Sequence, residues 1–548
     1  MKLEIKRYIV VAVLLICALV IVLFALKNDD ISSNKIENLV IYGDNIDTNY
    51  TPFMEGNIPY ISVDTVKKVI DKYIYYDKVA TKVIITTYDD VIKLKIGEKK
   101  MSRNLEITDI ENEAKIVEGE PYIPLTLFTD LYDITITYNE ETSTLSVDKK
   151  SEDDLKIKFN QVNVYEDIDT SSKVLETLYK NSTVKVYEES LNHSRWYKVR
   201  TEKGVVGYIS KNAVDIVEKD LENSEELKED DEIYNKKVVM FWQYGSNLET
   251  LGEKIDGVNV ASPTWYSLKN STGEISSEFN RAYYERAKSY GYEIWPIVTN
   301  GIDNANYSSE DTSKLMNSES SRENFIKNML KIAQDNKLDG INIDFESMRT
   351  DDKSLYTQFL RELAPIFRKY NIKVSVDMYF VAYMERGEIA KAVDYVILMG
   401  YDQRGSWSSE AGSISEISWV EDNIKSLIED SNIDAKKIIL GVPFYTRLWI
   451  ENLSSDSLTS RVYSMKNCED FLITNSLTKQ YDEKSGQNYA EYTKGNITYK
   501  LWIEDSTSMK NRVDLINKYE LSGLSGWQKG LETDDIWKTI KNNIKIGE

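Results

Sequence analysis

Carboxyl groups alternate along one short, otherwise apolar segment of the chain, residues 338–346. Asn342, Asp344 and Glu346 lie two residues apart, and the residues between them are apolar. A β-strand turns every second side chain to the same face, so a strand here would hold the three polar groups together. Adjacent carboxylates repel each other and one pKa rises, which a general acid requires. A salt-bridged strand end is the alternative, but no Lys or Arg lies between Leu338 and Met348.

The composition leaves carboxylates as the main candidates for catalysis. The 548 residues contain one histidine, His193, and two cysteines, Cys17 and Cys468. One histidine excludes a multi-histidine metal site, and its polar surroundings favour a solvated surface position. Two cysteines exclude a disulfide framework and cysteine-rich zinc modules. The formal net charge of −22 argues against a nucleic-acid-binding protein, which needs a basic face.

The C-terminal part of the chain, residues 236–548, alternates apolar strands with amphipathic helices. Helices are predicted at 322–336, 354–370 and 420–430, among others. The pattern predicts a (β/α)8 TIM barrel, with the acidic segment at the C-terminal end of the fourth strand, where barrel active sites lie. A doubly wound open sheet is the alternative, but no glycine-rich phosphate loop follows the first strand. The predicted strands are 238–244, 257–262, 294–299, 340–345, 374–378, 395–400, 438–443 and 521–527.

The acidic strand and its neighbours resemble a known family. Asp339-Gly340-x-Asn342-x-Asp344-x-Glu346 is similar to the DGxDxDxE signature of glycoside hydrolase family 18. Asn342 departs from the chitinase pattern, which usually has Asp there; cortex-lytic and cell-wall N-acetylglucosaminidases of the family share Asn-x-Asp-x-Glu. Further motifs follow in barrel order: Ser262-Pro263-Thr264-Trp265, Met399-Gly400-Tyr401-Asp402, Pro443-Phe444-Tyr445, Trp502-Ile503-Glu504-Asp505 and Gly526-Trp527. The resemblance spans about residues 236–537, and many members carry a small α+β insertion where residues 449–500 lie.

The resemblance implies roles for individual residues and no metal or cofactor. Glu346 would protonate the glycosidic oxygen, Asp344 would orient the substrate's acetamido group, and Tyr401 would donate its hydroxyl to the acetamido carbonyl. The attacking group would be the substrate's own acetamido oxygen, an exception to the two-carboxylate mechanism. Further substrate contacts would come from Asn342, Met399, Asp402, Tyr445, Arg447 and Trp527.

Two function classes follow from this resemblance. The first is a glycosidase that hydrolyses an N-acetylglucosamine-containing glycan, with vegetative peptidoglycan, spore cortex and chitin as alternative substrates. The second is a catalytically weak or inactive glycan-binding wall scaffold. The retention of Glu346, Asp344 and Tyr401 favours the enzyme. The sequence sets neither the oligomeric state nor exo or endo action.

Residues 40–149 contain an internal repeat. Glu-Gly-Asn-Ile-Pro-Tyr-Ile at 55–61 recurs as Glu-Gly-Glu-Pro-Tyr-Ile at 118–123, and each copy leads into a short amphipathic segment and then strands. The repeat resembles the N-terminal domain of copper amine oxidases, which often forms a stalk in exported bacterial proteins. The segment contains no histidine, so the resemblance does not imply copper.

Residues 157–216 read as short strands that resemble a bacterial SH3 domain, a small β-barrel. Such domains often bind wall peptides through exposed aromatic residues, and Trp196 and Tyr197 are candidates. The alternative is that these two residues only alternate between the core and the surface of the domain and have no role in binding. Nine of the fifteen residues at 218–232 are acidic, so residues 217–235 are interpreted as a solvated linker.

The N-terminus carries a candidate membrane anchor. Residues 8–26 are 19 consecutive uncharged, mostly apolar residues, which as a helix would span about 28 Å. Lys2, Lys6 and Arg7 precede them, which favours a cytoplasmic N-terminus and exported modules. A cleaved signal peptide is the alternative, but no small-x-small site follows the run. The expectation is a single-pass anchor within residues 1–28 and an extracytoplasmic wall enzyme of a bacterium, by composition and domains a Gram-positive one.

Overall fold

The computed structural model describes residues 35–151, 154–187, 195–216, 236–301, 308–346 and 348–545. The chain forms two compact units, residues 1–85 with 92–227 and residues 86–91 with 228–548. The predicted anchor at 8–26, His193 and the predicted linker at 217–235 lie outside the described residues. Within those described ranges, no helix is long and apolar enough to cross a membrane.

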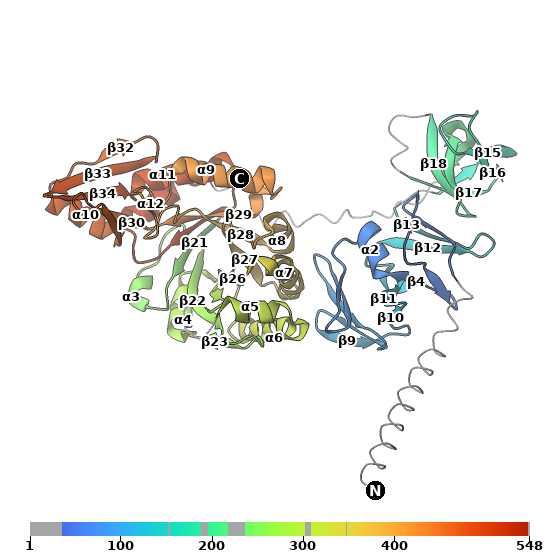
Figure 1. Cartoon of the computed structure of the whole chain (residues 1–548), viewed down its shortest axis with the longest axis horizontal. Coiled ribbons are helices and arrows are strands. Elements are labelled where there is room, and N and C mark those ends of the chain that lie inside the picture. The colour runs from blue at the N-terminus through green and yellow to red at the C-terminus, as the bar shows by residue number, and fades with distance from the viewer. Residues whose placement is uncertain are drawn as a thin grey trace, which may run out of the picture. The chain divides into compact units, whose positions relative to one another are not determined.

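The sequence repeat forms two hairpins that pair with each other (Figure 1). The first copy forms β3 (Phe53–Glu55) and β4 (Ile58–Ser62), and the second forms β10 (Lys115–Val117) and β11 (Glu120–Pro124). The inner strands β4 and β11 are antiparallel, with Ile61 opposite Ile123, so equivalent residues of the two copies meet in one sheet. Helix α2 (Val63–Val69) follows the first copy and a 3₁₀ turn (Leu125–Phe128) follows the second. Two further sheets complete this part: β1 (Asn38–Ile41), β2 (Asp44–Asn45), β12 (Ile134–Asn139) and β13 (Thr144–Lys149); and β5 (Tyr75–Asp77), β6 (Lys82–Thr86), β7 (Val91–Lys95), β8 (Lys100–Arg103) and β9 (Glu106–Asp109).

The SH3-like segment is one seven-stranded sheet. Tyr197 packs against its core, whereas Trp196 meets the edge of Tyr165 with ring centroids 5.7 Å apart. Trp196 and Tyr165 both line a hollow of about 390 Å³, so Trp196 faces the surface and Tyr197 the core. In sheet order the strands are β16 (Val174–Tyr179), β15 (Gln161–Tyr165), β19 (Val206–Ser210), β18 (Trp196–Thr201), β17 (Thr183–Val186), β14 (Asp154–Ile157) and β20 (Val214–Ile216).

The repeat segment and the SH3-like segment belong to the same compact unit, although their sequences read as separate modules. Asp148 is fully buried and accepts hydrogen bonds from Arg200 Nε at 3.3 Å and from the Tyr187 hydroxyl at 2.8 Å. A buried carboxylate is stable only when it is paired and hydrogen-bonded. Asp148 belongs to the repeat segment, and its hydrogen-bond donors Tyr187 and Arg200 belong to the SH3-like segment. The sequence alone does not predict this contact.

The second unit contains a closed parallel barrel, as expected (Figure 1). Strand β21 pairs with both β22 and β35, which closes the ring. Most of the expected strand bounds agree with those observed to within two residues, but two strands differ more. The second strand begins at Val260 and continues to Leu268, and the third is divided at Pro296, which has no N–H to donate to a ladder. The barrel strands are β21 (Val238–Gln243), β22 (Val260–Leu268), β24 (Glu293–Ile294) with β25 (Ile297–Thr299), β26 (Gly340–Asp344), β27 (Lys373–Met378), β28 (Tyr395–Met399), β29 (Ile438–Pro443) and β35 (Gly523–Trp527).

Helices cover the outside of the barrel, and each buries an apolar stripe against the strands. Helix α6 (Glu319–Asp335) is joined to α7 (Lys353–Arg368) by the fully buried ion pair between Arg322 and Glu362, 3.0 Å apart. The predicted helix at 420–430 begins earlier, as α9 (Ile417–Lys425), and ends in a π-helical turn (Ser426–Asp430). The other helices are α3 (Leu248–Leu251), α4 (Arg281–Ser289), α5 (Ser309–Met316), α8 (Arg386–Ala392), α11 (Ser506–Lys518) and α12 (Asp534–Asn543).

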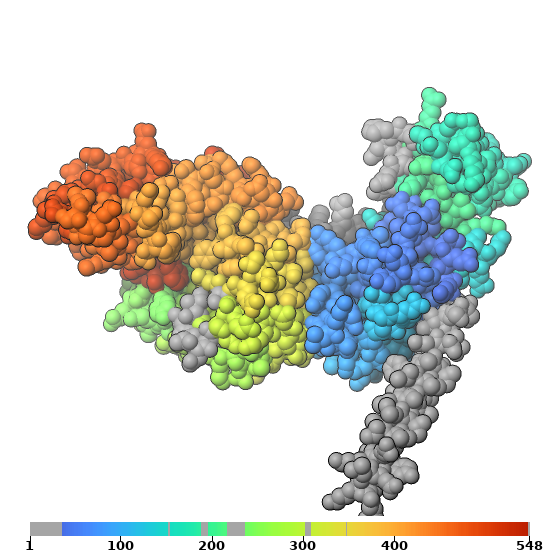
Figure 2. Space-filling model, viewed as in Figure 1, coloured from blue at the N-terminus to red at the C-terminus, as the bar shows by residue number. Residues whose placement is uncertain are grey.

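A five-stranded antiparallel sheet separates the seventh and eighth barrel strands. Its helix α10 (Met465–Thr474) contributes Cys468 and Leu472 to a small core that is distinct from the barrel interior. Figure 2 shows this orange and red segment projecting beside the barrel. In sheet order its strands are β31 (Ser457–Ser464), β30 (Tyr445–Asn452), β34 (Ile497–Ile503), β33 (Gln487–Lys494) and β32 (Gln480–Asp482), so the sheet begins and ends a few residues outside the expected 449–500.

Candidate active site

Strand β26 places the acidic segment as its alternation predicts. Ile341, Ile343 and Phe345 are fully buried, and the polar residues between them take the opposite face. Asn342 lies deepest and is fully buried, Asp344 is partly buried, and Glu346 is exposed just beyond the end of the strand. The three side chains therefore form a ladder from the barrel interior to its C-terminal mouth.

The first two residues of the motif have structural roles at the opposite end of the strand. Asp339 pairs with Lys288 of α4 at 3.0 Å and accepts a hydrogen bond from the Ile294 backbone N–H at 2.8 Å. A Cβ on Gly340 would lie 2.7 Å from the Trp295 ring, so only glycine fits here without a shift. Asp339 and Gly340 thus fix the start of the strand and do not reach the mouth.

Glu346 is held by neighbours from three directions. Its backbone N–H donates to Asn300 Oδ1 at 3.2 Å, and its carbonyl accepts from the Tyr383 hydroxyl at 2.9 Å. Its carboxyl shares a hydrogen bond with Asp344 and accepts one from the Tyr379 hydroxyl. Asp344 and Glu346 thus place two carboxyl groups on one face of the strand at the mouth, where two negative charges would repel each other.

The surroundings of Glu346 favour its protonated form. Desolvation by the surrounding protein raises the pKa of Glu346, and the charge of Asp402 raises it further. The hydrogen bonds from Asp344 and Tyr379 act in the opposite direction but do not cancel the increase. A carboxyl that is exposed to a substrate, yet keeps its proton above the usual glutamate range, is suited to general acid catalysis.

Asn342 joins two other strands below the acids. The Trp242 indole Nε1 donates to Asn342 Oδ1 at 2.7 Å, and Asn342 Nδ2 donates to Asp377 Oδ1 at 2.9 Å. Trp242 comes from β21 and Asp377 from β27. Both amide atoms have protein partners and the side chain is fully buried, so Asn342 supports the strand from within.

The aromatic residues expected at the site gather around Trp242. Its ring meets Tyr401 at a centroid distance of 6.4 Å and Trp527 at 6.0 Å, both at steep angles. Tyr401 is almost completely buried, and burial raises the pKa of its hydroxyl well above the usual range, so it remains a donor. Met399 lies in the same apolar cluster. Trp527 is half-buried at the edge of this cluster, where an apolar floor for a sugar ring would lie.

Asp402, Tyr445 and Arg447 form a second polar group at the mouth. The Tyr445 hydroxyl donates to Asp402 Oδ1, and Asp402 adopts a left-handed backbone conformation with φ of 56°. Arg447, two residues further along β30, donates from Nη1 to Ser460 Oγ at 2.9 Å on the inserted sheet. Burial raises the pKa of the Tyr445 hydroxyl, and the nearby Arg447 charge opposes this increase. The structure thus brings all nine expected site residues to one end or the interior of the barrel.

Sequence reasoning missed the contribution of β27. Ser375, Asp377 and Tyr379 alternate with apolar residues along it, the same two-residue period that identified β26. Asp377 is almost completely buried and Tyr379 reaches Glu346. The signal was present in the sequence, but a single Asp in an apolar strand is a weaker indication than a run of acids.

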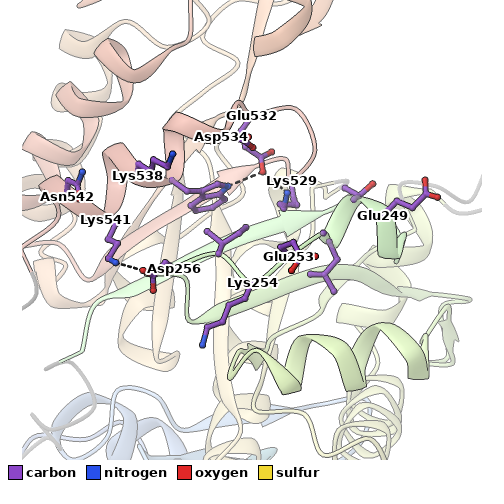
Figure 3. Close-up of a pocket in the computed structure, with 15 residues that line it drawn as sticks. Glu249, Glu253, Lys254, Asp256, Lys529, Glu532, Asp534, Lys538, Lys541 and Asn542 are labelled. Carbon is purple, nitrogen blue, oxygen red and sulfur yellow. Dashed lines mark hydrogen bonds and ion pairs between the residues drawn. The ribbon is translucent and has the colours of Figure 1, made fainter.

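A separate groove of about 710 Å³ lies where α12 passes the segment between α3 and β22 (Figure 3). Its lining contains two ion pairs: Lys541 pairs with Asp256, and Lys529 pairs with Glu532 at 2.8 Å. Glu532 also accepts from the Trp537 indole at 3.0 Å. The groove is lined by none of the nine expected site residues, so the site remains the mouth around Glu346.

Comparison with protein families agrees with this geometry. Residues 301–532, which contain Glu346 and most of the mouth, match the family described as "Glycosyl hydrolases family 18". The chain contains a family 18 glycosyl hydrolase domain. It is therefore a glycoside hydrolase. Residues 40–147 match the copper amine oxidase N-terminal domain and residues 160–215 match the bacterial SH3 domain.

The family 18 domain has relatives among the proteins of Bacillus subtilis. An "uncharacterized glycosylase YvbX" of Bacillus subtilis is 24% identical over 298 residues, which cover 52% of this chain and 84% of that protein. The "cortical fragment-lytic enzyme" of Bacillus subtilis is 26% identical over 276 residues, or 47% of this chain and 62% of that enzyme. The chain thus spans under two thirds of the latter's length.

A solved structure confirms the fold. The spore cortex-lytic enzyme SleL of Bacillus cereus superposes with a TM-score of 0.52 at 20% identity, covering 57% of this chain and 75% of that chain. At this identity the likeness shows that the family 18 domain is the same kind of barrel.

Proposed function

We propose that this family 18 domain hydrolyses N-acetylglucosamine-containing wall glycan, with Glu346 as the general acid. The observation that carries the proposal is the position of Glu346: it is exposed at the open end of the barrel, next to Asp344 on the same face of β26, and desolvation raises its pKa. The similarity to a cortical fragment-lytic enzyme makes peptidoglycan the preferred glycan. Chitin remains the competing substrate.

The position of Asp344 supports a substrate-assisted mechanism. An enzymic nucleophile must attack from the face of the sugar opposite the acid, with the two carboxyls about 5 Å or more apart. Asp344 and Glu346 lie two residues apart on the same face of β26, so Asp344 lies beside the acid and not opposite it. In this proposal the 2-acetamido oxygen of the substrate attacks the anomeric carbon while Glu346 protonates the departing oxygen. The anomeric configuration is then retained after water opens the oxazolinium ion.

The neighbouring residues would stabilise this intermediate. Asp344 would accept the acetamido N–H and stabilise the positive charge that develops on it. The buried Tyr401 hydroxyl would donate to the acetamido carbonyl oxygen and hold it near the anomeric carbon. Trp527 would provide the apolar surface below the ring, and Asp402 a hydrogen-bond acceptor for a sugar hydroxyl.

Product analysis on purified polymers tests the proposal. We expect new reducing ends from peptidoglycan or cortex, each at an N-acetylglucosamine residue, and fewer from chitin at equal accessible sugar. A non-catalytic wall scaffold, the alternative function, would bind the polymers and release no reducing ends. Release from chitin alone would reject wall glycan as the substrate and keep the glycosidase.

We also propose that residues 8–26 anchor the protein in the cell membrane with its catalytic part outside. The support is the length of the apolar run and the basic residues before it. Full-length protein should sediment with membranes, resist extraction by high salt and dissolve in detergent. A form that begins near residue 28 and occurs only in the medium would show that the segment is a cleaved signal.

A further inference from the structure

Strand β27 carries a buried carboxyl directly below the catalytic pair. Asp377 is 3% exposed, and its neighbours in β27, Val376 and Met378, are fully buried on the other face. Strands β26 and β27 are parallel, with Ile343 opposite Val376. The same register places Asp377 beside Asp344, which is two residues before Glu346 on the strand. Three carboxyls therefore lie in a row over two strands, from Asp377 in the barrel interior to Glu346 at the mouth.

The amide of Asn342 holds Asp377 in place, donating to its carboxyl at 2.9 Å. The Trp242 indole holds the other end of that amide, so the Asn342 side chain has one orientation, oxygen toward β21 and nitrogen toward β27. Within the described ranges, no Lys or Arg forms an ion pair with Asp377. A buried carboxyl without a cation is costly to ionise, and burial raises the pKa of Asp377 well above its usual range.

The groups that face Asp377 are acids and phenols. They come from α7, from the end of β26 and the residues just after it, and from the residues just after β27 and β28. A charge on Asp377 would therefore act directly on the catalytic acid. A negative charge there disfavours ionisation of Glu346, and ionisation of Glu346 disfavours a charge on Asp377. Such groups titrate together, with apparent pKa values that belong to the set. The titratable members are Asp344, Glu346, Tyr356, Tyr379 and Tyr401.

We propose that Asp377 is a positioning residue for the catalytic strand. It is hydrogen-bonded to the Asn342 amide and takes the place of a carboxyl at position 342, which β26 does not have. In this position it sets the pH range in which Glu346 can donate its proton. The amide and the carboxyl work as a pair across two strands. Either strand can carry the acid, provided that the other carries the amide. This inference rests on the proposed glycosidase activity.

The test exchanges the two groups. We would measure kcat/KM against pH on one soluble chito-oligosaccharide for the wild type, Asn342→Asp, Asp377→Asn and the double exchange Asn342→Asp/Asp377→Asn. Asp377→Asn removes an ionisable neighbour of Glu346, so the alkaline limb should move to lower pH by about half a unit or more. Asn342→Asp adds one, so the limb should move to higher pH.

The double exchange is the decisive variant. It restores one acid and one amide with the hydrogen bond reversed: the new amide on β27 would donate to the new carboxyl on β26, which still accepts from the Trp242 indole. Its alkaline limb should return to within about 0.3 pH unit of the wild type, although kcat falls. If Asp377→Asn does not fold, the double exchange still decides, because it keeps the buried pair. Two results would overturn the proposal. One is a double exchange whose alkaline limb is displaced as far as that of Asn342→Asp. The other is that the pH profiles of all four proteins superimpose.

Ser375→Ala is the matched control. Ser375 lies on the same face of β27, is fully buried, and donates its hydroxyl to the Ile341 carbonyl at 3.3 Å. Its loss should lower the melting temperature and leave the pH profile in place. Failure of the proposed function would look different: the wild type itself would release no reducing ends at any pH. An active wild type with profiles that do not respond to Asp377 refutes the positioning role alone.

Discussion

Replacing Glu346 by Gln should lower kcat on a glycan substrate by about 10²–10⁴-fold, which is the rate enhancement that general acid catalysis usually provides. The amide keeps the size of the side chain and can still accept a hydrogen bond from Tyr379, but it has no proton to give to the glycosidic oxygen. Binding should persist, because the aromatic contacts around Trp242 are unchanged. We would measure kcat and KM on chito-oligosaccharides and, separately, binding to the insoluble polymer.

The leaving group provides an internal control for this variant. With a dinitrophenyl glycoside, the departing oxygen needs no proton, so Glu346→Gln should recover most of the lost rate. Near-normal turnover of the natural substrate by Glu346→Gln would mean that another group supplies the proton. Equal loss on both substrates would indicate that the mutation damages the site in some other way.

The fold of the barrel could be predicted because its strands are short, mostly apolar runs, even though polar residues alternate along β26 and β27. Each of the eight runs is long enough to be recognised, and the helices between them show a clear apolar stripe. Errors arose where the chain departs from regular pairing. Pro296 breaks the third strand into two short ladders, and the second strand extends past Pro263 into a hairpin with β23 (Ile275–Ser277).

From the residues alone, the candidate site was predictable only where its members follow one another in the sequence. Residues from other strands, such as Tyr401 and Trp527, were expected only through the family resemblance. Asn342, Asp344 and Glu346 share one strand, so their spacing alone predicts a common face. Trp242 and Asp377 come from the strands at either side of the interior, about a hundred residues before and thirty-five after Asn342. Contacts between strands depend on register and on barrel closure. The structure is needed to show that Asn342 bridges these two residues.

Replacing Asp344 by Asn should lower kcat by about 10²–10³-fold with little change in KM, since its charge is needed mainly in the transition state. As the acetamido oxygen attacks, positive charge develops on the acetamido nitrogen, and the carboxylate at 344 would stabilise it. An amide of the same shape can still accept a hydrogen bond but carries no charge. The variant also replaces the carboxyl that lies beside Glu346, whose pKa should change as well.

The same pair of substrates separates the two carboxyl roles. A dinitrophenyl glycoside avoids the need for an acid but not the need for acetamido attack, so Asp344→Asn should stay slow on it while Glu346→Gln recovers. Oligosaccharides whose acetamido oxygen is replaced by sulfur should bind and inhibit the wild type, because they mimic the attacking group. If Asp344→Asn regains the wild-type rate on the activated substrate, Asp344 serves only to keep Glu346 protonated, and the attacking group must be sought elsewhere in the mouth.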